Sequence, residues 1–182
     1  MTAINSDAEI VRLQQRLRDE GHYTGRLDGI FGPLTLSAQI HTHGAPAYML
    51  VAAGELGVSE ILGARDNPRI RAYHAATTLG EQPDEVPWCS SFACWVIMRG
   101  GGRSTRSAAA RSWLGWGAEP WSALPSVGAV AVLSRGRAPS GHVGFVVHWD
   151  ARRLWLLGGN QGDRVSIQAF QKARLLGLRV AP

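Results

Sequence analysis

A cysteine at the start of an apolar helix is the residue of this chain best suited to covalent chemistry. Cys89 lies in VPWCSSFACWVIM, where Pro87 suits a first helical turn because its missing N–H would have no intrahelical partner there. The spacing of Phe92, Trp95 and Val96 predicts one apolar face on that helix. Cys89 therefore falls in the first turn, where the helix dipole and free backbone N–H groups favour the nucleophilic thiolate.

The second cysteine of the same helix has a different environment. Cys94 lies one turn deeper in the apolar run, where a thiol acts as an inert core residue. Their spacing points the two side chains in different directions, so we expect no disulfide between Cys89 and Cys94. We also expect no metal site, because two thiols without a partner pair at ligand spacing make a poor zinc site. The backbone N–H groups of Cys89 or Ser90 are candidates for holding the oxyanion of an acyl transfer.

A thiol nucleophile needs a base, and two histidines on one predicted strand compete for that role. His142 and His148 lie in GHVGFVVHW and share a face through the alternation of a strand. If this strand and the segment RRLWLLGGN form a hairpin, His142 faces Asn160 and His148 faces Leu154. An amide beside an imidazole fixes its tautomer and its orientation, which is the third role in a catalytic triad. His142 is therefore the predicted base.

The ordered set of Cys89, His142 and Asn160 predicts catalysis more strongly than any one of its members. A cysteine in an apolar helix is usually core, and a single strand histidine is usually satisfied by hydrogen bonds. If the hairpin register slips by one position, Gln161 replaces Asn160 as the residue that orients His142.

This set resembles the catalytic residues of the papain-like amidohydrolases of bacterial cell walls, the NlpC/P60 and CHAP groups. The resemblance runs from about Ala47 to Ile167 and is carried by ELGVSEILGARDNPRIRAYHAAT, PWCSSFACWV, SAAARSWLGWG, GHVGFVV and LLGGNQGDRVSI. It implies that Cys89 is the nucleophile, that His142 is the general base and then the acid, and that Asn160 orients His142. Such chemistry needs no metal and no organic cofactor.

Helical patterns followed by strand patterns predict an α+β fold around these residues. AYMLVAAGELG predicts a buried helix, and ARDNPRIRAYHAAT predicts a loop that enters another helix at Pro68. SAAARSWLGWG most simply predicts a further helix with a small face. Strands are predicted by GAVAVLS, GHVGFVVHW, RRLWLLGGN, DRVSIQAF and LLGLRVA. This order favours a papain-like domain over residues 46–182, with helices packed on an antiparallel sheet.

The first part of the chain has a separate helical pattern. Ile10, Leu13 and Leu17 recur at helical spacing, Gly21 is suited to end that helix, and a second helix is predicted after Pro33. The string LQxxL…GxxxGxxDGxFGxxT, which spans this region, resembles the small peptidoglycan-binding module of many wall hydrolases.

That second resemblance implies that residues 1–45 hold the stem peptide or the glycan of peptidoglycan. The candidate binding residues of the module are Tyr23, Asp28, Gly29, Phe31 and Thr35. The aspartate and the glycine also suit a tight turn, and the two aromatic residues also suit a core. We expect a structural turn whose surrounding surface binds. Trp88 is a further candidate for substrate contact, and Trp113, Trp116 and Trp121 line the groove or pack in the core.

Composition limits the partners of the chain without choosing among them. The 182 residues include 19 Lys and Arg against 14 Asp and Glu, a net charge of +5, which attracts polyanions in general. The first residues, MTAINSDAEIVRLQQ, lack the basic and apolar regions of a secretory signal, and no stretch reaches the roughly 20 apolar residues of a membrane span. We expect a monomer made in the cytoplasm that acts on the cell wall (periplasm) after release or delivery, with no nucleic-acid partner and no membrane insertion.

These observations predict a peptidoglycan hydrolase, with bacterial peptidoglycan as its partner. The cleaved amide lies in the stem peptide, which is the preferred interpretation, or is the N-acetylmuramoyl-L-alanine bond. The module order, the high isoelectric point and the missing signal favour an endolysin. The alternatives are a toxin of the same chemistry delivered into rival cells, a catalytically inactive wall-binding protein, and a thiol acyltransferase with the same triad.

Overall fold

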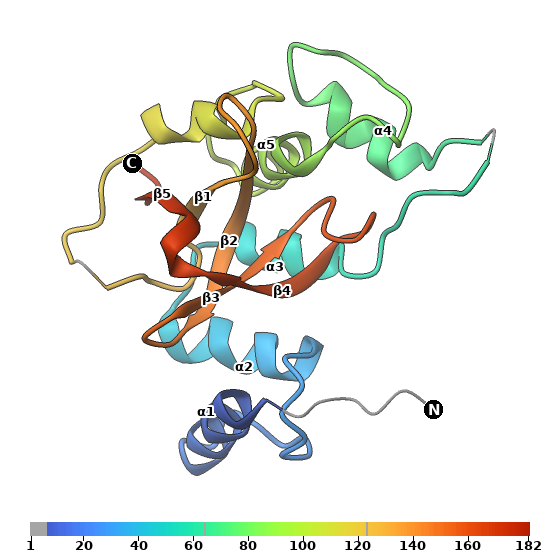
Figure 1. Cartoon of the computed structure of the whole chain (residues 1–182). Coiled ribbons are helices and arrows are strands. Elements are labelled where there is room, and N and C mark those ends of the chain that lie inside the picture. Colours follow the sequence, from blue (N-terminus) through green and yellow to red (C-terminus); the bar gives the residue numbers. More distant parts are fainter. Residues whose placement is uncertain (1–6, 64, 123) are drawn as a thin grey trace. The chain divides into compact units, whose positions relative to one another are not determined.

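The structure of the chain, a computed structural model, describes residues 7–63, 65–122 and 124–182 (Figure 1). The chain divides into two compact units, Met1–Ala45 and Pro46–Pro182. None of the helices in the described part of the chain has the length and hydropathy that a membrane span requires.

Two helices and a turn-rich loop make up the first unit. Helix α1 spans Ala8–Asp19, and the side chain of Asp7 caps its start by accepting a hydrogen bond of 2.9 Å from the Glu9 N–H. Helix α2 spans Pro33–His43 and ends at Gly44, whose φ of 55° lies in the left-handed region that glycine favours. The buried residues of α1 are Ile10, Leu13, Gln14 and Leu17.

An antiparallel sheet lies at the centre of the second unit. Its strands are β1 (Val130–Ser134), β2 (Gly141–Trp149), β3 (Arg153–Gly158), β4 (Ser166–Gln171) and β5 (Leu175–Arg179). They are ordered β4-β3-β2-β1-β5 across the sheet, so that the last strand pairs with the first. The α+β class predicted from the sequence is confirmed.

The helices of the second unit are α3 (Tyr48–Gly54), α4 (Pro68–Ala75) and α5 (Cys89–Arg99), with the short 3-10 helices η1 (Ala110–Gly115) and η2 (Lys172–Arg174). Helix α5 packs against β2, and both α3 and α4 pack against α5 (Figure 1). Every residue from Cys89 to Ile97 is buried, which accounts for the nearly continuous apolar run in this helix.

Aromatic side chains join α5 to the sheet. The ring of Phe92 lies 6.3 Å from that of Phe145 on β2, and the Tyr48 ring of α3 lies 5.5 Å from the same Phe145 ring. The Tyr48 hydroxyl donates a hydrogen bond of 2.8 Å to the carbonyl of Gly128, just before β1. Another apolar cluster of the sheet comprises Ala129, Ala131, Leu133, Val146, Leu154 and Leu156.

The segment SAAARSWLGWG is shorter in helical structure than its sequence predicts. Only Ala110–Gly115 is helical, and as a 3-10 helix. The Ser107 hydroxyl accepts a hydrogen bond of 3.2 Å from the Ala109 N–H, a local turn that competes with helix formation. The backbone of Ala109 and of Trp116 is extended, so the helix is bounded on both sides.

We predict that Phe92→Ala lowers the free energy of unfolding of the second unit by about 3–5 kcal/mol. Phe92 is fully buried between α4, α5 and β2, and its loss leaves a cavity that the packed rings cannot close. Urea unfolding followed by tryptophan fluorescence measures this, because all 7 tryptophans lie in the second unit. Met98→Ala is the matched control: Met98 is 39% exposed on the same helix, and we expect a loss below about 1 kcal/mol. Equal losses for the two variants would contradict the packing described.

Candidate active site

The nucleophile candidate, Cys89, is the first residue of α5. Trp88 is the N-cap, and the first backbone bond of the helix runs 2.9 Å from the Phe92 N–H to the Trp88 carbonyl. The N–H groups of Cys89 and Ser90 come before that bond and have no intrahelical acceptor. The thiol therefore lies beside backbone donors at the positive end of a helix.

Burial nevertheless keeps the Cys89 thiol protonated at rest. The side chain is buried, and this burial raises the pKa of the thiol. The N–H groups of Val143 and Ser90 and the charge of Arg135 lower that pKa by less. The thiolate expected from the position on the helix is thus not the resting form, because loss of water outweighs the local dipoles.

The base candidate, His142, lies near the start of β2, directly before the residue whose N–H faces the thiol. Its side chain is only 3% exposed. Burial lowers the pKa of the imidazole to about 4; the charges of Arg135 and Arg174 act in the same direction, and a hydrogen bond to Gln161 acts against them. The imidazole is therefore neutral at neutral pH, as a general base must be.

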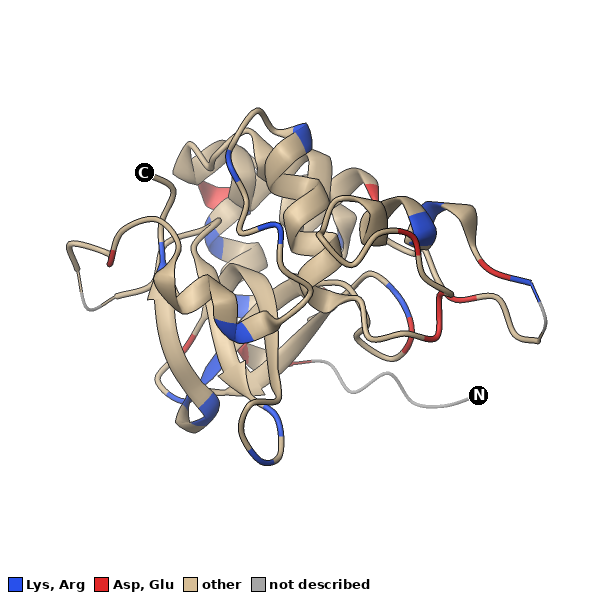
Figure 2. Ribbon diagram, turned by 90° about the horizontal axis from the view of Figure 1, so that it is seen from above, with Lys and Arg blue, Asp and Glu red and all other residues tan. Residues whose placement is uncertain are grey.

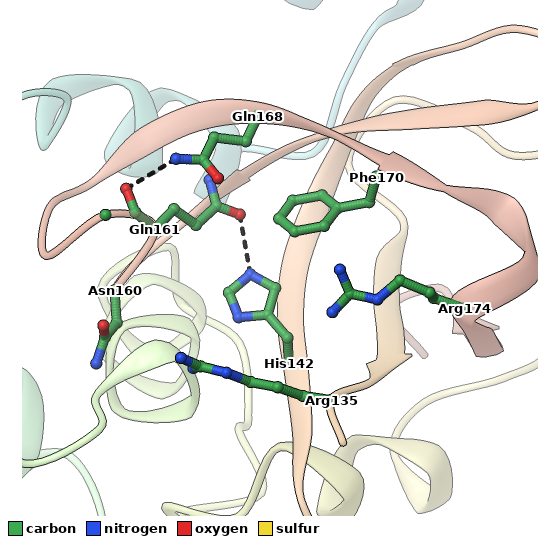
Figure 3. A pocket seen from close by; sticks show the side chains of 8 residues that line it. Arg135, His142, Asn160, Gln161, Gln168, Phe170 and Arg174 are labelled. Atoms are coloured by element: carbon green, nitrogen blue, oxygen red, sulfur yellow. Dashed lines mark hydrogen bonds between the residues drawn. The ribbon is translucent and has the colours of Figure 1, made fainter.

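Gln161 determines which imidazole nitrogen carries the proton (Figure 3). Its Nε2 amide group donates to the carbonyls of Ser166 (2.7 Å) and Leu156 (3.2 Å), so its Oε1 must face the other way. That Oε1 lies 2.9 Å from Nε2 of His142. The oxygen can only accept, so His142 carries its proton on Nε2 and presents the lone pair of Nδ1.

The preferred orienting residue, Asn160, is corrected by this geometry. The expected register holds at the middle of the hairpin, where Phe145 pairs with Leu157. Strand β3 ends at Gly158, and Asn160 then has a φ of 54°, so the chain leaves the sheet before it comes opposite His142. Among the described residues, the side chain that hydrogen-bonds His142 is Gln161, the alternative that follows from a shift of one position.

Two consecutive glycines allow the loop after β3 to adopt this conformation. A Cβ on Gly158 would lie 2.8 Å from Oε1 of Gln161. A Cβ on Gly159 would lie 2.5 Å from the Trp88 ring and 2.6 Å from Cβ of Phe92. Gly158 thus leaves room for the orienting amide, and Gly159 lets the loop approach the start of α5. The pair Gly-Gly before Asn-Gln is the sequence signal that points to this close approach.

Trp88, a predicted substrate contact, is a core residue instead. Its side chain has no exposed surface, and its indole N–H donates a hydrogen bond of 2.8 Å to Oε1 of Glu60. The ring packs beneath Gly159 and beside Tyr73. A side chain enclosed in this way cannot touch substrate. Trp113 is likewise fully buried, whereas Trp121 is fully exposed.

Two cavities open beside the reacting groups. The first, of about 190 Å³, is lined by His142, Gln161, Gly162, Asn160, Gln168, Phe170, Arg135 and Arg174 (Figure 3). The second, of about 340 Å³, is lined by Cys89, Pro87, Ala108, Ala109, Ala110, Pro139, Ser140, Gly141 and Arg135. Arg135 is thus the residue that lines both. Neither Arg135 nor Arg174 was singled out in the sequence, where the arginines are scattered without a motif.

The Cys89 thiol and the His142 imidazole lie in the same site but do not hydrogen-bond each other in the described structure. The described interactions of Cys89 and His142 include no hydrogen bond between Sγ and Nδ1, and the sulfur faces the N–H of Val143. Such bonds often tighten only when substrate is bound. The arrangement supplies a nucleophile, a base of fixed tautomer and backbone donors for an oxyanion, which suffices for acyl transfer.

The predicted binding residues of the first unit surround one buried side chain, Gln14. Its Nε2 lies 2.9 Å from the Asp28 carboxylate and 3.2 Å from the Tyr23 hydroxyl, and its Oε1 accepts from the Gly29 N–H at 3.0 Å. Tyr23 also donates to a backbone carbonyl, and the Thr35 hydroxyl lies 3.3 Å from the same amide. Gln14, which matched the motif, was not singled out as the centre of this network.

This network corrects two of the predicted binding residues. Tyr23 and Thr35 are 5% and 1% exposed, and their hydroxyls are bonded within the unit, so they hold the turn together. Gly29 is buried with a φ of 71°, which also suits a structural turn. Asp28 is exposed and Phe31 is partly exposed, and the hydrogen bond from Gln14 lowers the pKa of the Asp28 carboxyl.

Comparison with known proteins gives one finding. Residues 81–160 match the family model of the CHAP domain, a stretch that includes Cys89, His142 and Asn160 and ends directly before Gln161. No curated protein matches the chain. The match supports a CHAP-like hydrolase of peptidoglycan, and the α+β fold of the second unit is consistent with it. In the described residues, no group of three or more His, Cys, Asp or Glu is placed to hold a metal ion.

We predict that the pKa of His142 is about 4 and that it rises in Arg135→Gln and in Arg174→Gln. Each arginine lowers that pKa by opposing protonation of the buried ring, so removal of its charge makes protonation easier. Titration of the imidazole by NMR measures the shift without any need for activity. The control is Arg137→Gln, an exposed residue of the same β1–β2 loop that does not line the cavity. A His142 pKa that does not change in either test variant would contradict the electrostatics described.

Proposed function

We propose that the second unit is a thiol hydrolase that cleaves an amide bond of bacterial peptidoglycan, with Cys89 as nucleophile and His142 as base. The observation that carries this proposal is the fixed tautomer of His142, set by Gln161 beside a thiol at a helix start. The CHAP match supports the choice of peptidoglycan as substrate.

Attack on the amide begins from the neutral pair. Nδ1 of His142 takes the proton of the Cys89 thiol while Sγ bonds to the carbonyl carbon of the substrate. The carbonyl oxygen becomes an oxyanion, for which the N–H groups of Cys89 and Ser90, which have no intrahelical acceptor, are candidate donors. The imidazolium that forms keeps its Nε2–H bond to Oε1 of Gln161, which stabilises the charge.

Collapse of the tetrahedral intermediate completes the first half of the reaction. The imidazolium gives its Nδ1 proton to the leaving nitrogen, the C–N bond breaks, and the amine departs from a thioester on Cys89. Water then attacks the thioester carbon while His142 takes a proton from it. Breakage of the C–S bond restores the thiol and releases a carboxylic acid.

We propose further that the cleaved bond lies within the stem peptide and that the protein acts as an endolysin. The alternative bond is the N-acetylmuramoyl-L-alanine amide, which the same chemistry would hydrolyse. The first unit would hold the wall through the surface around its turn, where Asp28 and Phe31 are accessible. A net charge of +5 favours adhesion to anionic wall polymers. A delivered toxin would use the same active site.

We expect purified peptidoglycan sacculi to yield soluble fragments with the protein and none with Cys89→Ala. The variant lacks the atom that forms the thioester, while Cys94→Ala, at the other and fully buried thiol, serves as the control that keeps cleavage. Mass spectrometry of the products names the bond: a new amine inside the stem indicates an endopeptidase, and a free L-alanine amine indicates an amidase. Fragments from neither the protein nor Cys94→Ala, with sacculus binding retained, would leave a wall-binding protein instead.

We predict that Gln161→Ala lowers kcat by roughly 100-fold while Asn160→Ala lowers it much less. Without the Gln161 amide, the proton of His142 is free to move to Nδ1, which removes the lone pair that accepts the thiol proton. Rates are measured on soluble muropeptides, and circular dichroism verifies that both variants fold. The reverse order of effects would restore Asn160 as the orienting residue.

A further inference from the structure

We propose that Arg135 and Arg174 form a subsite for a carboxylate of the substrate, so that the enzyme selects a stem peptide with a free carboxylate next to the cleaved amide. This inference rests on the proposed function, because it names the substrate class of the same site. Its physical basis is a pair of guanidinium groups beside His142 that line one cavity without a carboxylate partner there.

Arg174 is held in place before any ligand arrives. Its Nε and Nη2 donate to the carbonyl of Ser134 at 3.1 Å and 2.9 Å, and the Ser134 hydroxyl donates back to the Arg174 carbonyl at 3.2 Å. The guanidinium also lies 5.3 Å from the centre of the Phe170 ring. Among the described residues, Nη1 of Arg174 has no acceptor. The side chain is therefore preorganised, which reduces the entropy lost on binding.

Arg135 lies within reach of both reacting groups. It lines the cavity of His142 and the cavity of Cys89, and its charge lowers the pKa of the imidazole and of the thiol. A ligand atom held by this guanidinium is consequently close to the carbonyl carbon that Cys89 attacks. The subsite thus recognises a group adjacent to the scissile amide rather than one far along the polymer.

Apart from the two arginines and His142, the residues that line the first cavity are uncharged, and they are either polar or apolar. Asn160 and Gln168 contribute amides, and the Gln168 amide donates to the Gln161 carbonyl at 3.0 Å (Figure 3). No Asp or Glu belongs to this described lining. Figure 2 shows Asp and Glu residues gathered on the loops around α4 instead. An incoming carboxylate would therefore provide the negative charge that the two arginines lack.

Guanidinium groups bind carboxylates through paired, charge-assisted hydrogen bonds, which makes a carboxylate the fitting ligand. In Figure 3 the two arginine side chains extend on different sides of the His142 ring, so positive charge flanks the imidazole where a carboxylate would enter the cavity. The cavity of about 190 Å³ has room for a carboxylate and the side chain that carries it. A peptide with a free carboxylate is the polymer component that the charge of this lining suits.

The test uses two soluble stem peptides that differ only in a carboxylate or a carboxamide next to the cleaved bond. For the protein we expect kcat/KM to be about 10- to 100-fold higher on the carboxylate form, mainly through KM. Arg135→Gln should lose this preference, because kcat/KM should fall further on the carboxylate form than on the carboxamide form, whatever change both forms share through the pKa of His142. Arg137→Gln, outside the cavity, should keep it. An equal fall of kcat on both peptides would overturn the proposal, because Arg135 would then act on the reaction itself.

Binding provides a readout that does not depend on cleavage. Cys89→Ala is titrated with both peptides by calorimetry, alone and combined with Arg135→Gln or Arg174→Gln. We expect tighter binding of the carboxylate peptide, weakened by salt and abolished as a preference by either arginine change. If Cys89→Ala prefers the carboxylate peptide but the wild type cleaves neither peptide, the proposed hydrolase activity is contradicted and the proposed subsite is supported. If the wild type cleaves the peptides but binding shows equal affinity for both, the hydrolase activity is supported and the subsite is contradicted. Arg174→Gln also removes the Ser134 contact, so Arg135→Gln is the deciding variant.

Discussion

Burial of the first nine residues of α5 is the constraint on which the rest of the second unit depends. Cys89 begins a helix that packs against β2 and is flanked by α3 and α4, so its backbone cannot move without disturbing a close-packed core. The same enclosure removes water from both reacting groups. It raises the pKa of the thiol and lowers the pKa of His142, and packing therefore sets protonation as well as position.

A neutral imidazole becomes a useful base only when its lone pair is on the correct nitrogen. Here two backbone carbonyls fix the orientation of the Gln161 amide. The amide oxygen in turn fixes the proton of His142 on Nε2. Gly158 makes the arrangement possible by leaving space for the amide oxygen. A similar principle holds in the first unit, where one buried amide, that of Gln14, organises a loop of otherwise independent turns.

Local patterns in the sequence were sufficient for the strands and for the start of α5, because alternation and the N-terminal proline act within a few residues. These local patterns could not predict how β2 and β3 pair at the end of the sheet near His142. The hairpin keeps the expected pairing at Phe145. The positive φ of Asn160 then turns the chain, so that Gln161 and not Asn160 hydrogen-bonds His142. Burial of Trp88 depends on Glu60, 28 positions earlier, and no local pattern reports such a contact.

Long-range topology also explains why the two arginines at the site escaped notice in the sequence. Arg135 follows β1 and Arg174 precedes β5, 39 positions apart by their numbers, and only the pairing of the last strand with the first brings these ends together. Hydrogen bonds between Ser134 and Arg174 then fasten the junction. The order of the strands brings the two arginines together, and no local sequence motif marks either of them.

The enclosure of Cys89 also bears on its chemical durability. Oxidation to sulfenic acid proceeds through the thiolate and requires access for the oxidant. The cavity that Cys89 lines gives access, but a thiol with a raised pKa offers little thiolate. The low thiolate fraction at rest therefore slows oxidation of the sulfur, and under the proposed mechanism the thiol loses its proton only when His142 takes it with substrate bound.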